Sequence, residues 1–207
     1  MSVPGRFLVI DGGDATGKTT QAGRLVQRLR EQGRAVLPTF EPGGTPLGAE
    51  LRHLLLDGTV TIEPEAEALL MAADRAQHVA DVIEPALARG AWVVSDRFVG
   101  SSLAYQGAAR GLGVDAVAAL NRFATGDLES DLVVYLDAPV EVLRARQKAH
   151  RDRIESEGDG FLEAVSAAYD ELARRLGWCV VDATPEPDEV EERVWRSIEV
   201  LVAESAR

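Results

Sequence analysis

Short apolar runs alternate along the chain with longer stretches in which apolar residues recur every three or four positions. The short runs are β-branched and apolar on both faces, as in buried parallel strands, and they occupy residues 6–11, 34–40, 91–96, 131–137 and 178–182. The longer stretches predict helices over 18–32, 47–56, 64–89, 114–125, 140–148, 160–176 and 188–203. This alternation predicts an α/β fold in which a five-stranded parallel sheet carries helices on both faces.

The carboxyl ends of the strands are the expected place for a ligand, because open parallel sheets bind their ligands outside those ends. Three segments fall there: residues 11–20 after the first strand, 40–46 after the second and 96–106 after the third. We therefore expect the chemistry of the protein in these three segments.

Residues 12–19 read GGDATGKT and match the phosphate-loop pattern G-x-x-x-x-G-K-[ST]. The loop follows an apolar strand and opens an amphipathic helix, so its backbone N–H groups would face phosphate oxygens. We expect Lys18 to reach the β- and γ-phosphates of a nucleotide and the Thr19 hydroxyl to bind Mg²⁺. The expected nucleotide-binding residues are Gly12, Gly13, Asp14, Ala15, Thr16, Gly17, Lys18, Thr19 and Thr20. The alternative is a glycine-rich turn that only ends the strand, and the matching context argues against it.

A phosphate loop does not by itself identify the reaction, and three classes compete. A GTP-dependent switch needs the base-reading sequence Asn-Lys-x-Asp, which is absent because the single asparagine, Asn121, is followed by Arg122. A mechanical ATPase needs partner surfaces and a longer chain. A small-molecule kinase needs an acceptor pocket and a basic lid, and the chain has candidates for both.

The candidate lid is the segment 144–158, which begins RARQKAHRDRIE in a protein whose net charge is −12. Charge runs are usually solvated helix faces, and that alternative stands for the run alone. This run, however, follows the fourth strand and a short helix. A closing loop of arginines there would neutralise a phosphoryl group in transfer and exclude water.

The segment 95–107 follows the third strand and is the candidate acceptor pocket. Asp96 ends that strand, where a second acidic group near Mg²⁺ is expected, although it could instead cap the following helix. Arg97 suits an acceptor phosphate, which a guanidinium binds with two hydrogen bonds. Polar side chains at helical spacing suit a sugar or base edge, although an ordinary polar helix looks similar; they are Ser101, Ser102, Tyr105 and Gln106.

Composition bounds the remaining possibilities. The 207 residues fit one domain spanning 1–207, and the single cysteine, Cys179, excludes an internal disulfide. We expect a cytoplasmic protein without a membrane span, since no uncharged apolar run reaches roughly 20 residues. The net charge of −12 makes a nucleic-acid polymer a poor partner. His53, His78 and His150 form no recognisable catalytic or metal pattern.

Taken together, the motifs resemble those of bacterial thymidylate kinases along nearly the whole chain. The matching segments are GGDATGKTT, EPGGTPLG, AADRAQH, DRFVGSSLAYQGAARGLG, DLVVYLD, RDRIE and VVDAT, in that order. The resemblance implies a P-loop kinase three-layer sandwich that transfers the γ-phosphate of ATP to dTMP, with Mg²⁺ and usually as a homodimer. Two alternatives stay open: a kinase for another nucleoside monophosphate, and a nucleotide-binding protein that does not catalyse.

Carried over by position, the resemblance assigns roles to individual residues. It places Asp14 near the sugar 3′-hydroxyl, Arg97 on the acceptor phosphate and Arg75 on the base, although Arg75 could equally form an ion pair with Asp74 or another neighbour. It places Ser102, Tyr105 and Gln106 beside base and sugar, and residues 182–184 beside adenine. Because the phosphate loop has no arginine, the chain resembles the lid-arginine type, in which Arg153 is the best catalytic candidate and Arg144 and Arg151 are its neighbours.

Three positions depart from the family pattern. Phe40 precedes Glu41 where the family commonly has arginine, and we expect it to pack on the substrate. Met71 stands where the family usually stacks a phenylalanine on thymine, and a thioether can pack against a ring. Phe98 follows Asp96 and Arg97 where tyrosine or histidine is more usual.

Overall fold

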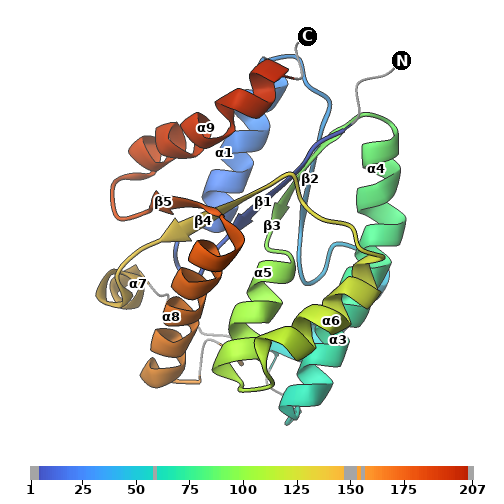
Figure 1. Cartoon of the computed structure of the whole chain (residues 1–207), viewed down its shortest axis with the longest axis vertical. Helices are drawn as coiled ribbons and strands as arrows, with labels where there is room; N and C mark the ends of the chain where they lie inside the picture. Colours follow the sequence, from blue (N-terminus) through green and yellow to red (C-terminus); the bar gives the residue numbers. More distant parts are fainter. Residues whose placement is uncertain (1–4, 58–59, 147–152, 155–156, 205–207) are drawn as a thin grey trace.

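The computed structural model describes residues 5–57, 60–146, 153–154 and 157–204. In these residues five parallel strands form one sheet in the order β2-β3-β1-β4-β5 (Figure 1). The strands are β1 Phe7–Asp11, β2 Val36–Phe40, β3 Trp92–Asp96, β4 Leu132–Asp137 and β5 Cys179–Asp182. Each ends at the predicted residue and begins one or two residues later than predicted. The predicted α/β fold with a five-stranded parallel sheet is confirmed.

The helices also follow the predicted pattern, with two local differences. They are α1 Lys18–Glu31, α2 Pro46–Leu56, α3 Pro64–His78, α4 Glu84–Ala88, α5 Val99–Ser102, α6 Val114–Thr125, α7 Val140–Arg146, α8 Asp159–Leu176 and α9 Pro187–Glu204. Two π-helical segments are η1 Val79–Ile83 and η2 Leu103–Ala109. Residues 147 and 148 of the predicted helix 140–148 lie outside the described residues.

The predicted helix over 64–89 is continuous but widens into η1 just before Pro85. Proline lacks an N–H group and its ring crowds the carbonyl four residues earlier, so a wider turn relieves the conflict. The second difference is the helix after β3, where the sequence indicated only helical spacing. It forms as α5 followed by η2, and π-helical turns occur frequently at functional sites.

The sheet is buried on both faces, and β1 shows this most simply. Leu8 and Ile10 belong to the core beneath α1 and α9, whereas Phe7 and Val9 belong to the core beneath η1 and α4. A third cluster lies between η2 and α8 around Tyr135 and Tyr169. Figure 1 shows α9 beside α1, with α3, α4, α5 and α6 gathered on the other side. The result is three layers, as predicted.

Gly100 allows the helix after β3 to approach the end of β1. A Cβ atom at this position would lie 2.7 Å from Asp11 Oδ2 and 2.8 Å from the Trp178 ring. The close approach brings the neighbouring serines, Ser101 and Ser102, to the carboxyl ends of the strands. No helix within the described ranges is both long enough and apolar enough to cross a membrane.

Candidate active site

A cavity of about 910 Å³ lies at the carboxyl ends of the strands. It is lined by most of the residues that the sequence nominated: Asp14, Ala15, Gly17, Lys18, Thr19, Thr20, Phe40, Glu41, Met71, Arg75, Asp96, Arg97, Ser101, Ser102, Tyr105 and Gln106. Segments up to about 90 residues apart in the chain therefore meet in one place, because parallel strands end at the same edge of the sheet. The remaining nominated residues shape the loop, belong to the lid or lie at the end of β5, as residues 182–184 do.

The phosphate loop has the backbone geometry that its glycines permit. Gly12 and Gly17 have φ angles of 146° and 94°, and Ala15 also has a positive φ of 65°. The Gly13 carbonyl accepts hydrogen bonds from the Thr16 hydroxyl at 2.9 Å and from Lys18 Nζ at 2.6 Å. Burial and the charge of Arg97 lower the pKa of Lys18 to about 8. The Lys18 ammonium group is thus held in the loop, beside the position at which a nucleotide phosphate would bind.

The donor set for a cation is small and consists of oxygen atoms. The Thr19 hydroxyl donates to Asp96 Oδ2 at 2.5 Å, which joins the start of α1 to the end of β3. Within the described residues no group of three or more His, Cys, Asp or Glu side chains could hold a metal. One hydroxyl and one carboxylate fit Mg²⁺, which is commonly held by one or two carboxylates together with substrate phosphates and water.

Asp14 joins the phosphate loop to the acceptor side of the cavity. One carboxylate oxygen is paired with the Arg97 guanidinium, and the other accepts a hydrogen bond from the Tyr105 hydroxyl at 2.8 Å. Burial would raise the pKa of Asp14, but the charges of Arg97 and Lys18 and these hydrogen bonds lower it below its usual value. The carboxylate is therefore ionised, and it links the phosphate loop to Arg97 after β3 and to Tyr105 on η2.

Arg97 is held in a backbone conformation that few non-glycine residues adopt, with φ at 72°. Its N–H donates to the Ile10 carbonyl at 3.0 Å, and its own carbonyl accepts from the Ser95 hydroxyl at 2.7 Å. Its guanidinium donates to the Gly12 carbonyl and to the Ser101 hydroxyl, both at 3.0 Å. Strained residues of this kind persist where the surroundings fix them, and they cluster at functional sites.

Two buried residues that the sequence analysis did not nominate support Ser101. The Ser101 hydroxyl donates to Asp11 Oδ1 at 2.7 Å and lies 2.9 Å from the Tyr169 hydroxyl. Tyr169 donates to the same Asp11 oxygen at 2.7 Å. The chain Tyr169, Asp11, Ser101 and Arg97 connects α8 to the acceptor side of the cavity.

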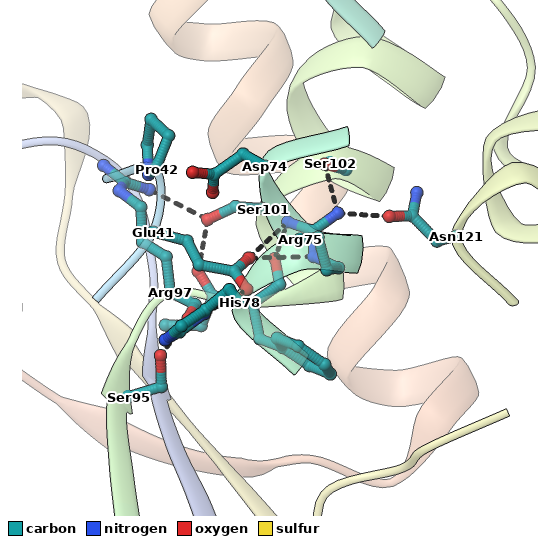
Figure 2. Close-up of polar contacts among 12 residues, drawn as sticks. Glu41, Pro42, Asp74, Arg75, His78, Ser95, Arg97, Ser101, Ser102 and Asn121 are labelled. Atoms are coloured by element: carbon teal, nitrogen blue, oxygen red, sulfur yellow. Dashed lines mark hydrogen bonds and ion pairs between the residues drawn. The ribbon is translucent and has the colours of Figure 1, made fainter. Parts of the chain in front are cut away.

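Arg75 lies at the centre of a buried polar cluster (Figure 2). Its Nε and one terminal nitrogen both lie 2.8 Å from Glu41 Oε2, and that same nitrogen donates to the Phe98 carbonyl at 3.0 Å. Its other terminal nitrogen donates to the Ser102 hydroxyl at 3.0 Å and to Asn121. The Arg75 guanidinium therefore donates four hydrogen bonds to protein acceptors and forms an ion pair with Glu41.

Of the two readings of Arg75, the ion pair exists, but with Glu41 and not with Asp74. Asp74 instead accepts a hydrogen bond from the Gly43 backbone at 3.0 Å. The second oxygen of Glu41 lies 2.8 Å from His78 Nδ1. Arg75 and Ser102, to whose hydroxyl it donates, both line the cavity. A contact between this pair of residues and a base is therefore compatible with the ion pair between Arg75 and Glu41.

The three departures from the family pattern differ in position. Met71 and Phe40 line the cavity, and the Phe40 ring is 46% exposed. Arg52, which the sequence analysis missed, also lines the cavity and lies 5.7 Å from the centre of the Phe40 ring. Phe98 instead packs edge-on against Phe7 in the core, with ring centres 4.9 Å apart. The change at Phe98 is therefore a matter of packing.

The described arginines of the lid have different partners. Arg144 pairs with Glu163 at 2.7 Å, and Arg146 donates to the Ala183 and Thr184 carbonyls, both at 2.8 Å. Arg146 lines the cavity. Arg153 pairs with Glu67 and is not among the described residues that line the cavity. Arg151 lies outside the described residues.

Comparison with known proteins agrees with this geometry. The family model described as thymidylate kinase matches residues 10–194, from β1 into α9. The chain belongs to the thymidylate kinase family. It is 47% identical over 206 residues to a thymidylate kinase of Thermomicrobium roseum, covering 97% of this chain and 98% of the relative. It is 49% identical to one of a Synechococcus species, covering 93% and 94%, and 44% identical to one of Bordetella pertussis, covering both chains fully.

One face of α3 carries a sequence signal that could have identified the part of the site that was missed. Glu67, Met71, Arg75 and His78 follow one another in α3 at intervals of four, four and three residues. They therefore share a face, and that face is buried together with Ala68 and Ala72. Two charged residues and a histidine on a buried stripe are a sequence signal for a polar network. Asn121 and Tyr169 give no comparable local signal.

Proposed function

We propose that residues 1–207 act as one thymidylate kinase domain that transfers the γ-phosphate of ATP to dTMP, giving dTDP and ADP. The observation that carries the proposal is the ion pair between Asp14 of the phosphate loop and Arg97 of the acceptor side, with Lys18 lining the same cavity. It joins a phosphate loop directly to a second cationic site in the same cavity. Two phosphate sites that share one carboxylate fit a donor and an acceptor aligned for in-line transfer.

On the donor side the loop residues 12–20 cradle the phosphates, and the Lys18 ammonium takes the β- and γ-oxygens. Thr19 and Asp96 would hold Mg²⁺, partly through water, and the ion would neutralise charge on the phosphates when bound. Arg144 and Arg151 of the lid are proposed to contact the phosphates of ATP. Arg153, which the resemblance favours for the transferring group, is bound to Glu67 in the structure.

On the acceptor side Arg97 fixes the phosphate of dTMP and Asp14 takes the sugar hydroxyl. The acceptor is a phosphate with a second pKa near 6, so it is already largely ionised at neutral pH and needs no strong general base. Phe40, Glu41, Met71 and Arg75 are proposed to hold the base with Ser101, Ser102, Tyr105 and Gln106. Charge in transfer is stabilised by positioned cations without a covalent intermediate on the protein.

An ADP-release assay across a panel of nucleoside monophosphates tests this function. The expected result is ATP-dependent turnover with a strong preference for dTMP. Preference for another monophosphate would mean that the protein phosphorylates a different acceptor. The altered acceptor specificity would then be attributed to Phe40 or Met71. No turnover with any acceptor, while ATP still binds, would support a nucleotide-binding protein without catalysis.

We further propose a homodimer located in the cytoplasm. Large apolar side chains are exposed on α3 and on the two helices that pack against it, namely Leu69 on α3, Leu54 on α2 and Phe123 on α6. Phe123 is 88% exposed, and exposed apolar patches commonly mark interfaces. Light scattering on the wild type and on Phe123→Ser tests the dimer. A monomeric wild type would contradict it.

A further inference from the structure

Glu67 is a fully buried carboxylate that lies behind the cavity wall. It sits in the first turn of α3, and its side chain is 1% exposed. Gln106 donates to Oε1 at 2.8 Å, Arg110 donates to the two oxygens at 3.3 and 3.1 Å, and Arg153 is paired with Oε2. A carboxylate buried to this degree needs such partners, because an unpaired buried charge is very costly.

Among the residues that the structure describes, the charges around Glu67 balance within one network. Arg110 also pairs with Glu157 at 2.7 Å, and its guanidinium lies 4.7 Å from the centre of the Phe161 ring. Two carboxylates, Glu67 and Glu157, thus face two guanidiniums, Arg110 and Arg153. Burial would raise the pKa of Glu67, but hydrogen bonds from Arg153, Gln106 and Arg110 hold it below its usual value. Removing either arginine would leave negative charge in excess.

Arg153 is fixed at two further points, both at the end of α2. Its Nε donates to the Leu55 carbonyl at 2.7 Å, and its backbone N–H donates to the Leu56 carbonyl at 3.0 Å. The last carbonyls of a helix lack partners within the helix and carry negative partial charge. A guanidinium therefore suits this position, and Arg153 caps α2 while it neutralises Glu67.

The residues that the network holds are themselves parts of the cavity wall. Leu56, whose carbonyl accepts from Arg153, and Ile154, which follows Arg153 in the chain, both line the cavity, and Ile154 is buried. Gln106 lines it as well, with its amide committed to Glu67. These three side chains lie on the wall shared with Met71 and Tyr105, where the base and sugar of the acceptor are proposed to bind.

We propose that Glu67 is a positioning residue that anchors Arg153 and Arg110, and that Arg153 acts as this anchor of the acceptor wall and not as a ligand of the transferring phosphate. The proposal rests on the proposed phosphorylation of dTMP. It makes a distinct kinetic prediction, because an anchor of the wall governs acceptor binding, whereas a phosphate ligand governs the rate of transfer.

A double-mutant cycle on Glu67→Ala and Arg153→Ala tests the assignment. Each single variant should raise KM for dTMP roughly tenfold and keep kcat within about threefold of wild type. The double variant should be no worse than the worse single variant, since either single variant already removes the ion pair between Glu67 and Arg153. KM for ATP should not change. Arg153→Lys should recover part of the loss, because an ammonium still reaches one carboxylate oxygen.

Thermal unfolding supplies a readout that does not depend on turnover. Each single variant should lower the midpoint by roughly 10 °C, since breaking a buried ion pair is strongly destabilising, and the two losses should not add. Glu67→Gln keeps the shape and serves if Glu67→Ala does not fold. The matched control cycle uses Glu171→Ala and Arg174→Ala, which remove an exposed ion pair on α8. In this cycle each variant should leave the unfolding midpoint almost unchanged, and the two small effects should be additive.

Several outcomes would overturn the proposal. One is a fall in kcat of roughly a hundredfold in Arg153→Ala with KM for dTMP unchanged and Glu67→Ala near wild type. A second is a higher kcat in Glu67→Gln, which would mean that Glu67 withholds Arg153 from the phosphates. A third is additive losses of stability. If wild-type protein does not phosphorylate dTMP, the proposed function fails, and the unfolding cycle still decides whether Glu67 and Arg153 form an anchor.

Discussion

Two carboxylate–arginine pairs near the cavity, Asp14 with Arg97 and Glu67 with Arg153, have the same chemistry in different surroundings. Asp14 and Arg97 both line the cavity, and their side chains are 16% and 18% exposed. Glu67 and Arg153 do not line it, and Glu67 is 1% exposed. Asp14 is paired with Arg97 after β3 and accepts a hydrogen bond from Tyr105 on η2, whereas Glu67 is enclosed by two arginines and a glutamine.

The difference separates groups that a substrate can engage from groups that hold the wall in place. A phosphate entering the cavity can compete for Arg97, because that guanidinium borders open space. Arg153 would have to leave a buried carboxylate and a helix carbonyl first, and this would leave Glu67 with excess charge. The same kind of ion pair thus borders the open cavity in one place and is enclosed by protein in the other.

The largest expected effect lies on the cavity side of the comparison. Lys18→Ala removes the ammonium held in the phosphate loop, and kcat should fall on the order of 10²- to 10³-fold, as on loss of a preorganised charge at the reacting group. Steady-state kinetics measures the effect, and circular dichroism checks that the fold is kept. Arg174→Ala, an exposed change on α8, should leave the rate unchanged. Turnover near wild type in Lys18→Ala would contradict the proposed mechanism.

Arg97→Ala should rank second. It removes the proposed acceptor-phosphate ligand and leaves Asp14 without its ion partner, so kcat/KM for dTMP should fall roughly a hundredfold. Arg97→Lys should recover only part of this loss, because an ammonium cannot reproduce the two parallel hydrogen bonds of a guanidinium. Titration calorimetry with dTMP provides the affinity. Full recovery by lysine would mean that charge alone, without geometry, binds the acceptor.

Asp14→Asn should have a smaller effect on the use of dTMP, and it tests whether the Asp14 carboxylate serves the acceptor side of the cavity. The amide keeps the size of the side chain but loses the charge that pairs with Arg97, so KM for dTMP should rise roughly tenfold. Binding of ATP should stay close to wild type, since the loop backbone is retained. Equal losses for both substrates would show that Asp14 only shapes the loop.

The smallest effect concerns pH and the buried pair. The pKa of Glu67 lies below the usual 4.5 of a glutamic acid side chain in the folded protein. Its contribution to stability is therefore complete above about pH 4.5 and is lost as the pH falls through the folded value. Denaturant unfolding of wild type and Glu67→Gln should differ by a constant amount near neutral pH. The difference should shrink below pH 4.5, and a constant difference down to pH 3 would contradict this.

Local patterns in the sequence were enough for much of the site. The run before Asp11 and the glycines at 12, 13 and 17 predicted a strand, a phosphate loop and a helix, because each depends on neighbouring residues. Asp96 and Arg97 could be expected near the loop, because open parallel sheets bind ligands at the carboxyl ends of their strands. That β1 and β3 are neighbours came from the structure. The alternation of strands and helices also predicted the layers.

Long-range partners could not be predicted in this way. Glu67 and Arg153 are separated by 86 positions, and Arg75 and Asn121 by 46. Spacing in the sequence does not distinguish which basic residue of the lid pairs with Glu67. The helical spacing of 101–106 likewise did not show that this segment widens into η2.

The sequence alone thus determined the order of the elements, the phosphate loop and the edge of the sheet at which the cavity lies. These features follow from periodicity and from backbone preferences that act over a few residues. Only the tertiary structure decided which carboxylate holds which arginine, and so which charges face the cavity. That choice depends on packing and desolvation, because a buried ion forms only where the surrounding chain supplies all of its partners.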